Sequence, residues 1–306
     1  MEFSVIIPVF NDPKGLRDTL DSVIKQDYLK SKYEIIVVDN GSTDSTVDVA
    51  KLYLNNYPKL IKYIAQSNNL GSYSARNLGI SQAKGKFISF IDADMTVKKD
   101  WLKKINKIIG NSNIGYLGCR VRVFSKENNL ASLYNVLNHF SVKERMEKEH
   151  YAPTCCLTVK RDVLKKIGSF DDRLFSGGDH MFGIKAWNSG VKFKYSDKIV
   201  MYHPARSSIY ALTKKAMRIG LYGRGGVSKL YPEMRNDINQ LYLNYKRYLP
   251  SKFWHIRHRY KCGYSFKIST IIFLSIFPPI IHYLTLFGYI RSKIISSPLK
   301  NNLGSK

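Results

Sequence analysis

The sequence has few acidic residues, few cysteines and only one long uncharged run. It contains 23 Asp and Glu against 49 Lys and Arg, which gives a formal charge of +26 over 306 residues. So large an excess of one sign implies a polyanionic neighbour, such as nucleic acid, an anionic membrane surface or a phosphate-bearing substrate. Charge alone does not choose among these three.

The four cysteines, Cys119, Cys155, Cys156 and Cys262, form no CxxC pair and have no metal-ligand spacing with histidines. Cys155 and Cys156 are adjacent, which is awkward for a disulfide framework. We therefore predict that all four are reduced.

The N-terminus lacks a basic segment, a long apolar segment and a small-residue cleavage site, so we expect no signal peptide. Hydrophobic residues make up 44% of the chain and aromatic residues 13%. This apolar content is enough to offset the entropy of ordering, so a disordered chain is not expected.

Three short apolar runs rich in Val, Ile and Phe predict buried parallel strands at 3–9, 34–39 and 86–91. Helices are predicted between and after them, from Asp12-Pro13 to Ile24, from about residue 45 to 55, and from 72 to 83. This alternation indicates a doubly wound α/β sheet, whose ligand crevice lies outside the carboxyl ends of the strands.

The C-terminal third differs in composition. Residues 206–267 hold 14 Lys and Arg but only two acids, and tyrosines are interleaved with the basic residues. Residues 268–290 carry no charge and are long enough to cross a bilayer, although Pro278-Pro279 would kink or break a spanning helix. A full span, a re-entrant or interfacial hairpin, and a buried helix pair all stay open.

Polar residues directly follow the predicted strands. Asn11, residues 39–42, and the pair Asp92 and Asp94 each come after an apolar run, so they should meet at one edge of the sheet. Two carboxylates spaced in this way can hold a hard divalent cation on a diphosphate. Taken alone, the pair could equally be solvated loop acids.

Four motifs in series carry a family resemblance: SVIIPVFN at 4–11, VVDNGSTDST at 37–46, ARNLG at 75–79 and DAD at 92–94. In this order they resemble family 2 glycosyltransferases, and the match covers about the first 205 residues. The resemblance implies the GT-A fold, a nucleotide-sugar-binding mixed sheet flanked by helices. Together with the change in composition after residue 205, this predicts four regions: a catalytic domain (1–205), a basic aromatic helical region (206–267), a hydrophobic membrane-associated segment (268–292) and a basic tail (293–306).

The resemblance also implies a nucleotide site. Backbone at Pro8 would line the base pocket, the Asp39 carboxylate would accept a base N–H, and Arg76 would lie near base or phosphate. Asp39 could instead stabilise its turn, and Arg76 could form a surface ion pair.

The resemblance assigns the metal and the diphosphate to a further group of residues. Asp94, Asp92 and His203 would hold Mn²⁺ or Mg²⁺ on the donor diphosphate, and Arg206 would contact the same diphosphate. A lone histidine is usually structural, so that alternative stays open for His203.

Asp179 is the candidate general base, because residues 175–182 resemble the acceptor-side segment of the family. The common family version has two consecutive acids, where this chain has Gly178-Asp179. Asp179 could instead be a helix N-cap.

We therefore predict an inverting transfer from a nucleoside diphosphate sugar, a UDP-sugar, to a hydroxyl of a lipid-linked or surface-polysaccharide acceptor in cell-envelope biosynthesis. One apolar segment and no QxxRW motif argue against a processive synthase. The enzyme would work at the cytoplasmic face of an anionic membrane, bound peripherally or by a single segment.

The sequence gives less support to three other functions. A nucleotidyltransferase should have a glycine-rich basic loop where residues 9–13 stand. A nucleic-acid partner is not expected, because no binding module is recognisable. An inactive membrane scaffold is disfavoured by the intact Asp92, Asp94 and Asp179.

Overall fold

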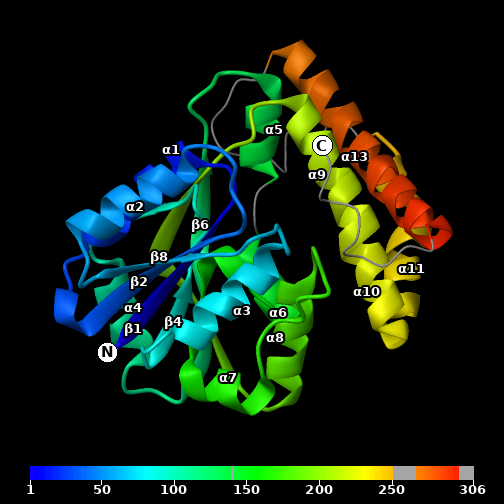
Figure 1. Ribbon diagram of the computed structural model, residues 1–306. Coiled ribbons are helices and arrows are strands. Elements are labelled where there is room, and N and C mark those ends of the chain that lie inside the picture. The colour runs from blue at the N-terminus through cyan, green and yellow to red at the C-terminus, as the bar shows by residue number, and fades with distance from the viewer. Residues whose placement is uncertain (139–140, 251–266, 296–306) are drawn as a thin grey trace.

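A computed structural model describes residues 1–138, 141–250 and 267–295. Within these residues the core is an eight-stranded sheet in the order β3-β2-β1-β4-β7-β6-β8-β5 (Figure 1). The strands are β1 (Phe3–Val9), β2 (Tyr33–Asp39), β3 (Ile61–Ala65), β4 (Phe87–Phe90), β5 (Thr96–Val97), β6 (Ile114–Phe124), β7 (Leu157–Lys160) and β8 (Lys192–Pro204).

The N-terminal half of the sheet is parallel. β1 pairs in parallel with both β2 and β4, and β2 pairs in parallel with β3. Every residue of β2 is buried, as expected for a parallel strand covered on both faces. The three strands predicted from sequence are thus confirmed, and the connecting helices are α1 (Pro13–Ile24), α2 (Thr46–Asn56) and α3 (Ser72–Gln82).

The other half makes the sheet mixed, which confirms the GT-A expectation. β7 runs antiparallel to both β4 and β6, β8 pairs in parallel with β6, and the short β5 is antiparallel to β8. The accompanying helices are α4 (Trp101–Ile109), α5 (Leu130–Leu137), α6 (Val142–Lys148), α7 (Arg161–Ile167) and α8 (Gly178–Asn188), with short turns η1 (Lys30–Lys32) and η2 (Thr154–Cys156).

Local sequence signals set the helix starts. The Asp12 carboxylate accepts a hydrogen bond from the Gly15 N–H at 2.8 Å, and Pro13 occupies the first turn of α1, as predicted. The buried residues of α1, among them Leu16, Leu20 and Val23, recur at helical spacing and pack toward the sheet.

Cys119, Cys155 and Cys156 are buried and free, as predicted. Burial raises the pKa of the Cys119 thiol well above its ordinary value, and a hydrogen bond that the Cys155 thiol shares with Cys156, together with burial, does so for Cys155. Cys262 lies outside the described residues.

The C-terminal part of the chain forms a layer of helices beside the sheet domain (Figure 1). It comprises α9 (Ile209–Arg218), η3 (Ile219–Arg224), α10 (Gly225–Leu230), η4 (Pro232–Met234), α11 (Arg235–Leu243), η5 (Tyr245–Tyr248) and α13 (Ile268–Ile294). Residues 251–266 of the predicted basic region and 296–306 of the predicted tail lie outside the described residues.

α13 differs from one sequence expectation. It runs unbroken through Pro278 and Pro279, where a hairpin or a break was one alternative. The two prolines remove two N–H donors, but Leu274 and Phe277 nearby are buried, Leu274 against α5 and Phe277 against α5 and α9, and this packing supports the helix. By length and composition, it is the one helix among the described residues that could cross a membrane.

Candidate active site

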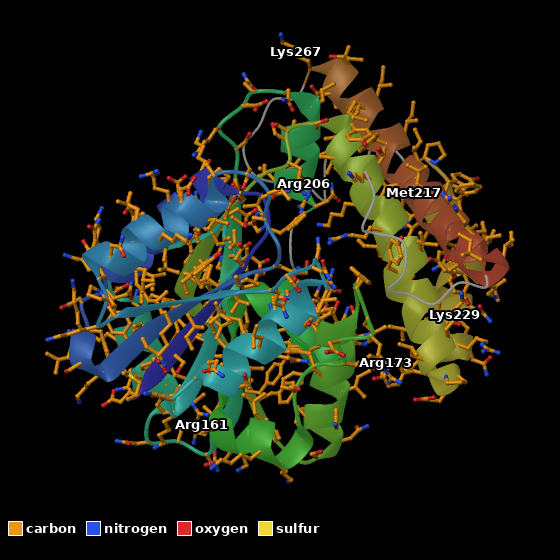
Figure 2. All side chains as sticks on the ribbon, viewed as in Figure 1. Arg161, Arg173, Arg206, Met217, Lys229 and Lys267 are labelled. Atoms are coloured by element: carbon orange, nitrogen blue, oxygen red, sulfur yellow. The ribbon has the colours of Figure 1, made fainter. Side chains whose placement is uncertain are left out.

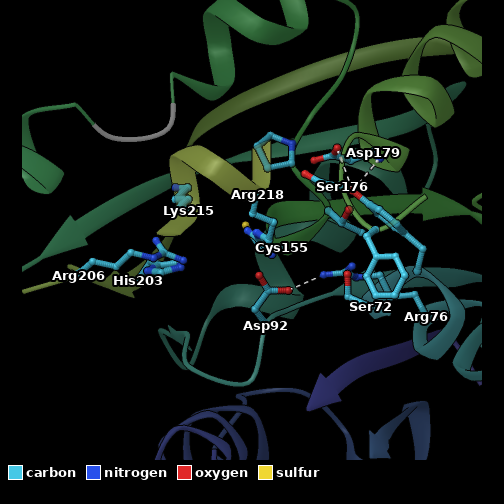
Figure 3. A pocket seen from close by; sticks show the side chains of 14 residues that line it. Ser72, Arg76, Asp92, Cys155, Ser176, Asp179, His203, Arg206, Lys215 and Arg218 are labelled. Carbon is cyan, nitrogen blue, oxygen red and sulfur yellow. Dashed lines mark hydrogen bonds and ion pairs between the residues drawn. The ribbon is translucent and has the colours of Figure 1, made fainter. Parts of the chain in front are cut away.

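The carboxyl ends of the parallel strands open onto two adjoining cavities. Figure 3 shows the first of them, which Asp179 lines. Arg76, Asp92 and His203 line both, so the two form one continuous site. Together the cavities gather seven of the eight predicted site residues: Pro8, Arg76, Asp92, Asp94, Asp179, His203 and Arg206.

The buried Arg76 forms an ion pair with the partly exposed Asp92. The Arg76 Nη2 atom lies 2.7 Å from Asp92 Oδ1, and the two side chains are 6% and 36% exposed. Arg76 is carried by α3 and Asp92 by the loop after β4, so the pair fixes that loop against the helix. The Arg76 Nε–H is buried without a hydrogen-bond partner among the described residues. The ion pair expected as an alternative for Arg76 therefore exists, but it lies inside the site.

Asp94 and His203 face each other across the site. His203 Nε2 lies 3.7 Å from Asp94 Oδ2, and His203 Nδ1 lies 2.6 Å from the Pro204 carbonyl oxygen. A carbonyl can only accept, so Nδ1 carries a hydrogen and Nε2 is the ring atom that faces Asp94. A proton on Nε2, or a cation between the two groups, makes this contact attractive.

Burial is the main influence on Asp94. It raises the pKa of this carboxyl, and His203 opposes the rise. Asp94 Oδ1 is also buried without a hydrogen-bond partner in the described part of the chain. An orphaned buried carboxylate oxygen is costly unless a cation or hydrogen bond satisfies it.

This donor set fits Mn²⁺ or Mg²⁺. No cluster of three or more His, Cys, Asp or Glu side chains among the described residues is arranged to enclose a metal by itself. Such cations are commonly held by one or two carboxylates, with substrate phosphates supplying other ligands. Asp94 and His203, with Asp92 beside them, could supply the protein's share.

Asp179 stands on the first turn of α8. Its Oδ1 accepts hydrogen bonds from the Tyr73 hydroxyl at 3.2 Å and the His180 N–H at 3.0 Å. The residue before the helix is Gly177, so Asp179 is not the N-cap. A Cβ on Gly178 would lie 2.8 Å from the Tyr73 ring, which explains why a second acid is absent at that position.

Asp39 is the predicted residue that lines neither cavity. Its side chain is buried, Oδ1 accepts from the Ser42 N–H at 3.0 Å, and Oδ2 accepts from the Tyr63 hydroxyl at 3.0 Å. These contacts are those of a turn-stabilising residue. A hydrogen bond from a base N–H to the Asp39 carboxylate remains a prediction.

Sequence reasoning missed two cations of the site, Lys215 and Arg218 on α9. Burial, with Arg206 and Arg218 nearby, lowers the pKa of Lys215 to about 8, and burial also lowers the pKa of Arg206. Figure 3 shows Lys215 and Arg206 on one side of the cavity and Asp179 at the far end. The basic composition of residues 206–267 was the available signal, but it pointed to a membrane and gave no hint that α9 returns to the site.

The chain is similar in sequence to known glycosyltransferases. The family described as Glycosyl transferase family 2 matches residues 4–168. Glycosyltransferase AglE of Haloferax volcanii is 34% identical over 218 residues, which cover 71% of each chain. The chain belongs to glycosyltransferase family 2. A poly(ribitol-phosphate) beta-N-acetylglucosaminyltransferase, TarS of Staphylococcus aureus, is 37% identical over 67% of this chain, but the match spans only 36% of TarS.

Solved structures confirm the GT-A fold of this family 2 enzyme. A mannosyltransferase from Pyrobaculum calidifontis, in complex with GDP-Man and Mn²⁺, aligns with a TM-score of 0.65 and 18% identity over 95% of this chain and 88% of that one. S. aureus TarS 1-349 with UDP-GlcNAc aligns with a TM-score of 0.57 and 21% identity over 96% and 91%. At these identities the likeness establishes the fold alone.

Proposed function

We propose that this family 2 enzyme transfers one sugar at a time from a UDP-sugar to a hydroxyl of a lipid-linked or surface-polysaccharide acceptor, with inversion and with Mn²⁺ or Mg²⁺. The observation that carries the proposal is one site holding Asp94 and His203, the cations of α9, and Asp179. These are the groups that a diphosphate leaving group and an attacking hydroxyl require.

The donor diphosphate would lie between the metal ligands and the cationic side. Asp94 and His203, with Asp92, would hold the cation, which when bound neutralises the leaving diphosphate. Arg206, Lys215 and Arg218 would donate charge-assisted hydrogen bonds to the phosphates. Arg76 would keep Asp92 in place through their 2.7 Å ion pair.

Asp179 would act as the general base. It lines the same cavity as Asp92 and His203. Its Oδ1 is fixed by Tyr73 and by the backbone of α8, while Oδ2 makes no hydrogen bond among the described residues. Oδ2 would therefore accept the proton of the acceptor hydroxyl as that oxygen attacks the anomeric carbon on the face opposite the diphosphate.

The relatives support the proposed acceptor class, and the charge and the apolar helix of this chain support the proposed location. The named relatives include a poly(ribitol-phosphate) transferase and the minor teichoic acid biosynthesis protein GgaB of Bacillus subtilis, which is 30% identical over 183 residues. With a charge of +26 and an apolar C-terminal helix, this chain would work at the cytoplasmic face of an anionic membrane.

The test is UDP release from a panel of UDP-sugars with Mn²⁺ and isolated envelope glycan as acceptor. Asp179→Asn should lower turnover by about a hundredfold to ten-thousandfold while keeping UDP affinity. Asp162→Asn, which alters an exposed acid on α7, is the matched control and should keep full activity. Substantial turnover by the Asp179 variant would exclude Asp179 as the base.

A further inference from the structure

One face of α13 is an uninterrupted apolar stripe open to solvent. Its residues are spaced three or four apart and are 43% to 76% exposed: Ile268, Ile272, Ile276, Ile280, Tyr283, Phe287, Ile290 and Ile294. At 100° per residue they fall within about 120° of the helix circumference. A patch of this length exceeds what soluble monomers ordinarily expose, so it indicates an interaction surface.

The opposite face is fastened to the domain along its length. Gly220 lies so close to the Thr285 carbonyl that any larger residue would overlap it, and a Cβ on Gly288 would come within 2.7 Å of the Met217 carbonyl oxygen. The Tyr289 hydroxyl also donates to Asn239 Oδ1 at 2.8 Å. α13 is therefore part of the helical layer, and Figure 1 shows it beside α9 and α10.

This packing argues against a helix that crosses the bilayer. α9 packs beside α13 and carries Lys214, Lys215 and Arg218. A spanning α13 would bring these side chains to hydrocarbon depth, where ionised groups are expensive. Lys215 and Arg218 also line the catalytic cavity, which would then lose its access to water-soluble donor.

We propose that α13 lies in the plane of an anionic bilayer and buries its apolar stripe among the lipids without crossing them. The helix has basic residues at both ends and no acid among residues 267–295: Lys267 precedes it, and Arg291 and Lys293 stand in its last turn. Figure 2 shows Lys267 at one end and Lys229 near the other, where its ammonium donates to the Ile295 carbonyl at 2.8 Å. These charges match anionic lipid headgroups.

The same charges disfavour a second copy of the chain as the occupant. Antiparallel pairing of two α13 helices would set Lys267 against Arg291 and Lys293, and parallel pairing would set each cation against its own copy. Both arrangements oppose like charges at each end of the interface.

The docked pose would also orient the active site. α9 lies between α13 and the cavity, with Lys215 on the cavity side. The site would thus sit about two helix diameters, roughly 20 Å, from the apolar stripe, because both α13 and α9 lie between them. A lipid-linked acceptor could reach it from the bilayer that α13 contacts. The inference shares the membrane premise of the proposed function, but its test needs no donor and no turnover.

The first experiment is sedimentation of the full chain with phosphatidylglycerol/phosphatidylcholine vesicles. The triple variant Ile276→Ser, Ile280→Ser, Phe287→Ser should bind at least tenfold more weakly, with unchanged circular dichroism and UDP affinity. The matched control Leu29→Ser, Leu52→Ser removes exposed apolar residues elsewhere, which are 64% and 48% exposed, and should bind as the wild type does. Equal binding by the wild type and the triple variant would overturn the proposal.

The second experiment measures depth with nitroxide labels placed singly at 272, 280 and 287 in a Cys262→Ser background. Equal depths at the three positions support an in-plane helix. A centre much deeper than both ends would show a span and overturn the proposal. A dimer that forms without vesicles, is lost in the triple variant and is accompanied by no vesicle binding would also overturn it. Lost transfer with intact vesicle binding would count against the proposed function and leave the docking standing.

Discussion

Replacing Lys215 with Met should stabilise the folded chain and weaken its binding of a nucleoside diphosphate. An ordinary lysine has a pKa near 10.5, whereas burial and the neighbouring arginines lower that of Lys215 to about 8. At pH 7 the difference amounts to a destabilisation of about 3 kcal/mol at most, which the variant removes. The proposed diphosphate site gives this charged lysine a role in binding, which the Met variant would lose.

The lowered pKa of Lys215 also predicts how the free energy of unfolding changes with pH. Between about pH 8 and 10.5 the unfolded chain keeps the Lys215 proton and the folded chain has lost it, so wild-type stability should rise with pH in that window. Below about pH 8 both states are protonated and the full penalty is present. The Met variant should lack this rise.

Urea unfolding at pH 7 and pH 9.5 measures the stability difference, and calorimetry measures UDP affinity. The variant should be the more stable protein at pH 7 and should bind UDP at least tenfold more weakly. Lys214→Met is the matched control, because Lys214 is an exposed residue of the same helix and does not line either cavity. Lower stability of Lys215→Met at pH 7, or unchanged UDP affinity, would refute the reasoning.

Three further outcomes are expected. Asp94→Asn should keep the fold but lose the stabilisation that UDP gives only with Mn²⁺, as thermal unfolding with and without the metal would reveal. Arg76→Ala should lower the free energy of unfolding by about 1–3 kcal/mol in urea, because Asp92 loses its 2.7 Å partner; an unchanged midpoint would contradict this. Gly220→Ala should cost a similar 1–3 kcal/mol through overlap with the Thr285 carbonyl, and a variant as stable as the wild type would disprove the close helix contact.

Local patterns predicted much of the catalytic domain. The run at 3–9 is a buried strand in both prediction and structure, because a short apolar run rich in Val and Ile suits a parallel strand covered on both faces. Asp92 and Asp94 were placed correctly for the same reason, since a strand end fixes where its following residues lie. β3 was missed, because only Ile61 of Ile61–Ala65 is fully buried and the segment lacks a long apolar run.

Features that depend on packing between distant segments could not be predicted from the sequence. Lys215 reaches the cavity only because α9 folds back across it, and nothing in the residues near 215 encodes that return. Pro278 and Pro279 signalled a break, yet the contact of α13 with α9 and η3 keeps the helix whole. The absence of a second acid beside Asp179 likewise depends on Tyr73, which is more than a hundred residues away in sequence.

Calorimetric titration of UDP with and without Mn²⁺, in the wild type and in Asp94→Asn, tests the assigned nucleotide and metal site most directly. UDP at about 100 times its dissociation constant should stabilise the wild type by about 2.7 kcal/mol with the metal present. The account predicts tight binding only with Mn²⁺ and only when Asp94 is intact. UDP binding that is equally tight without the metal and in the variant, or no binding of UDP at all, would contradict it.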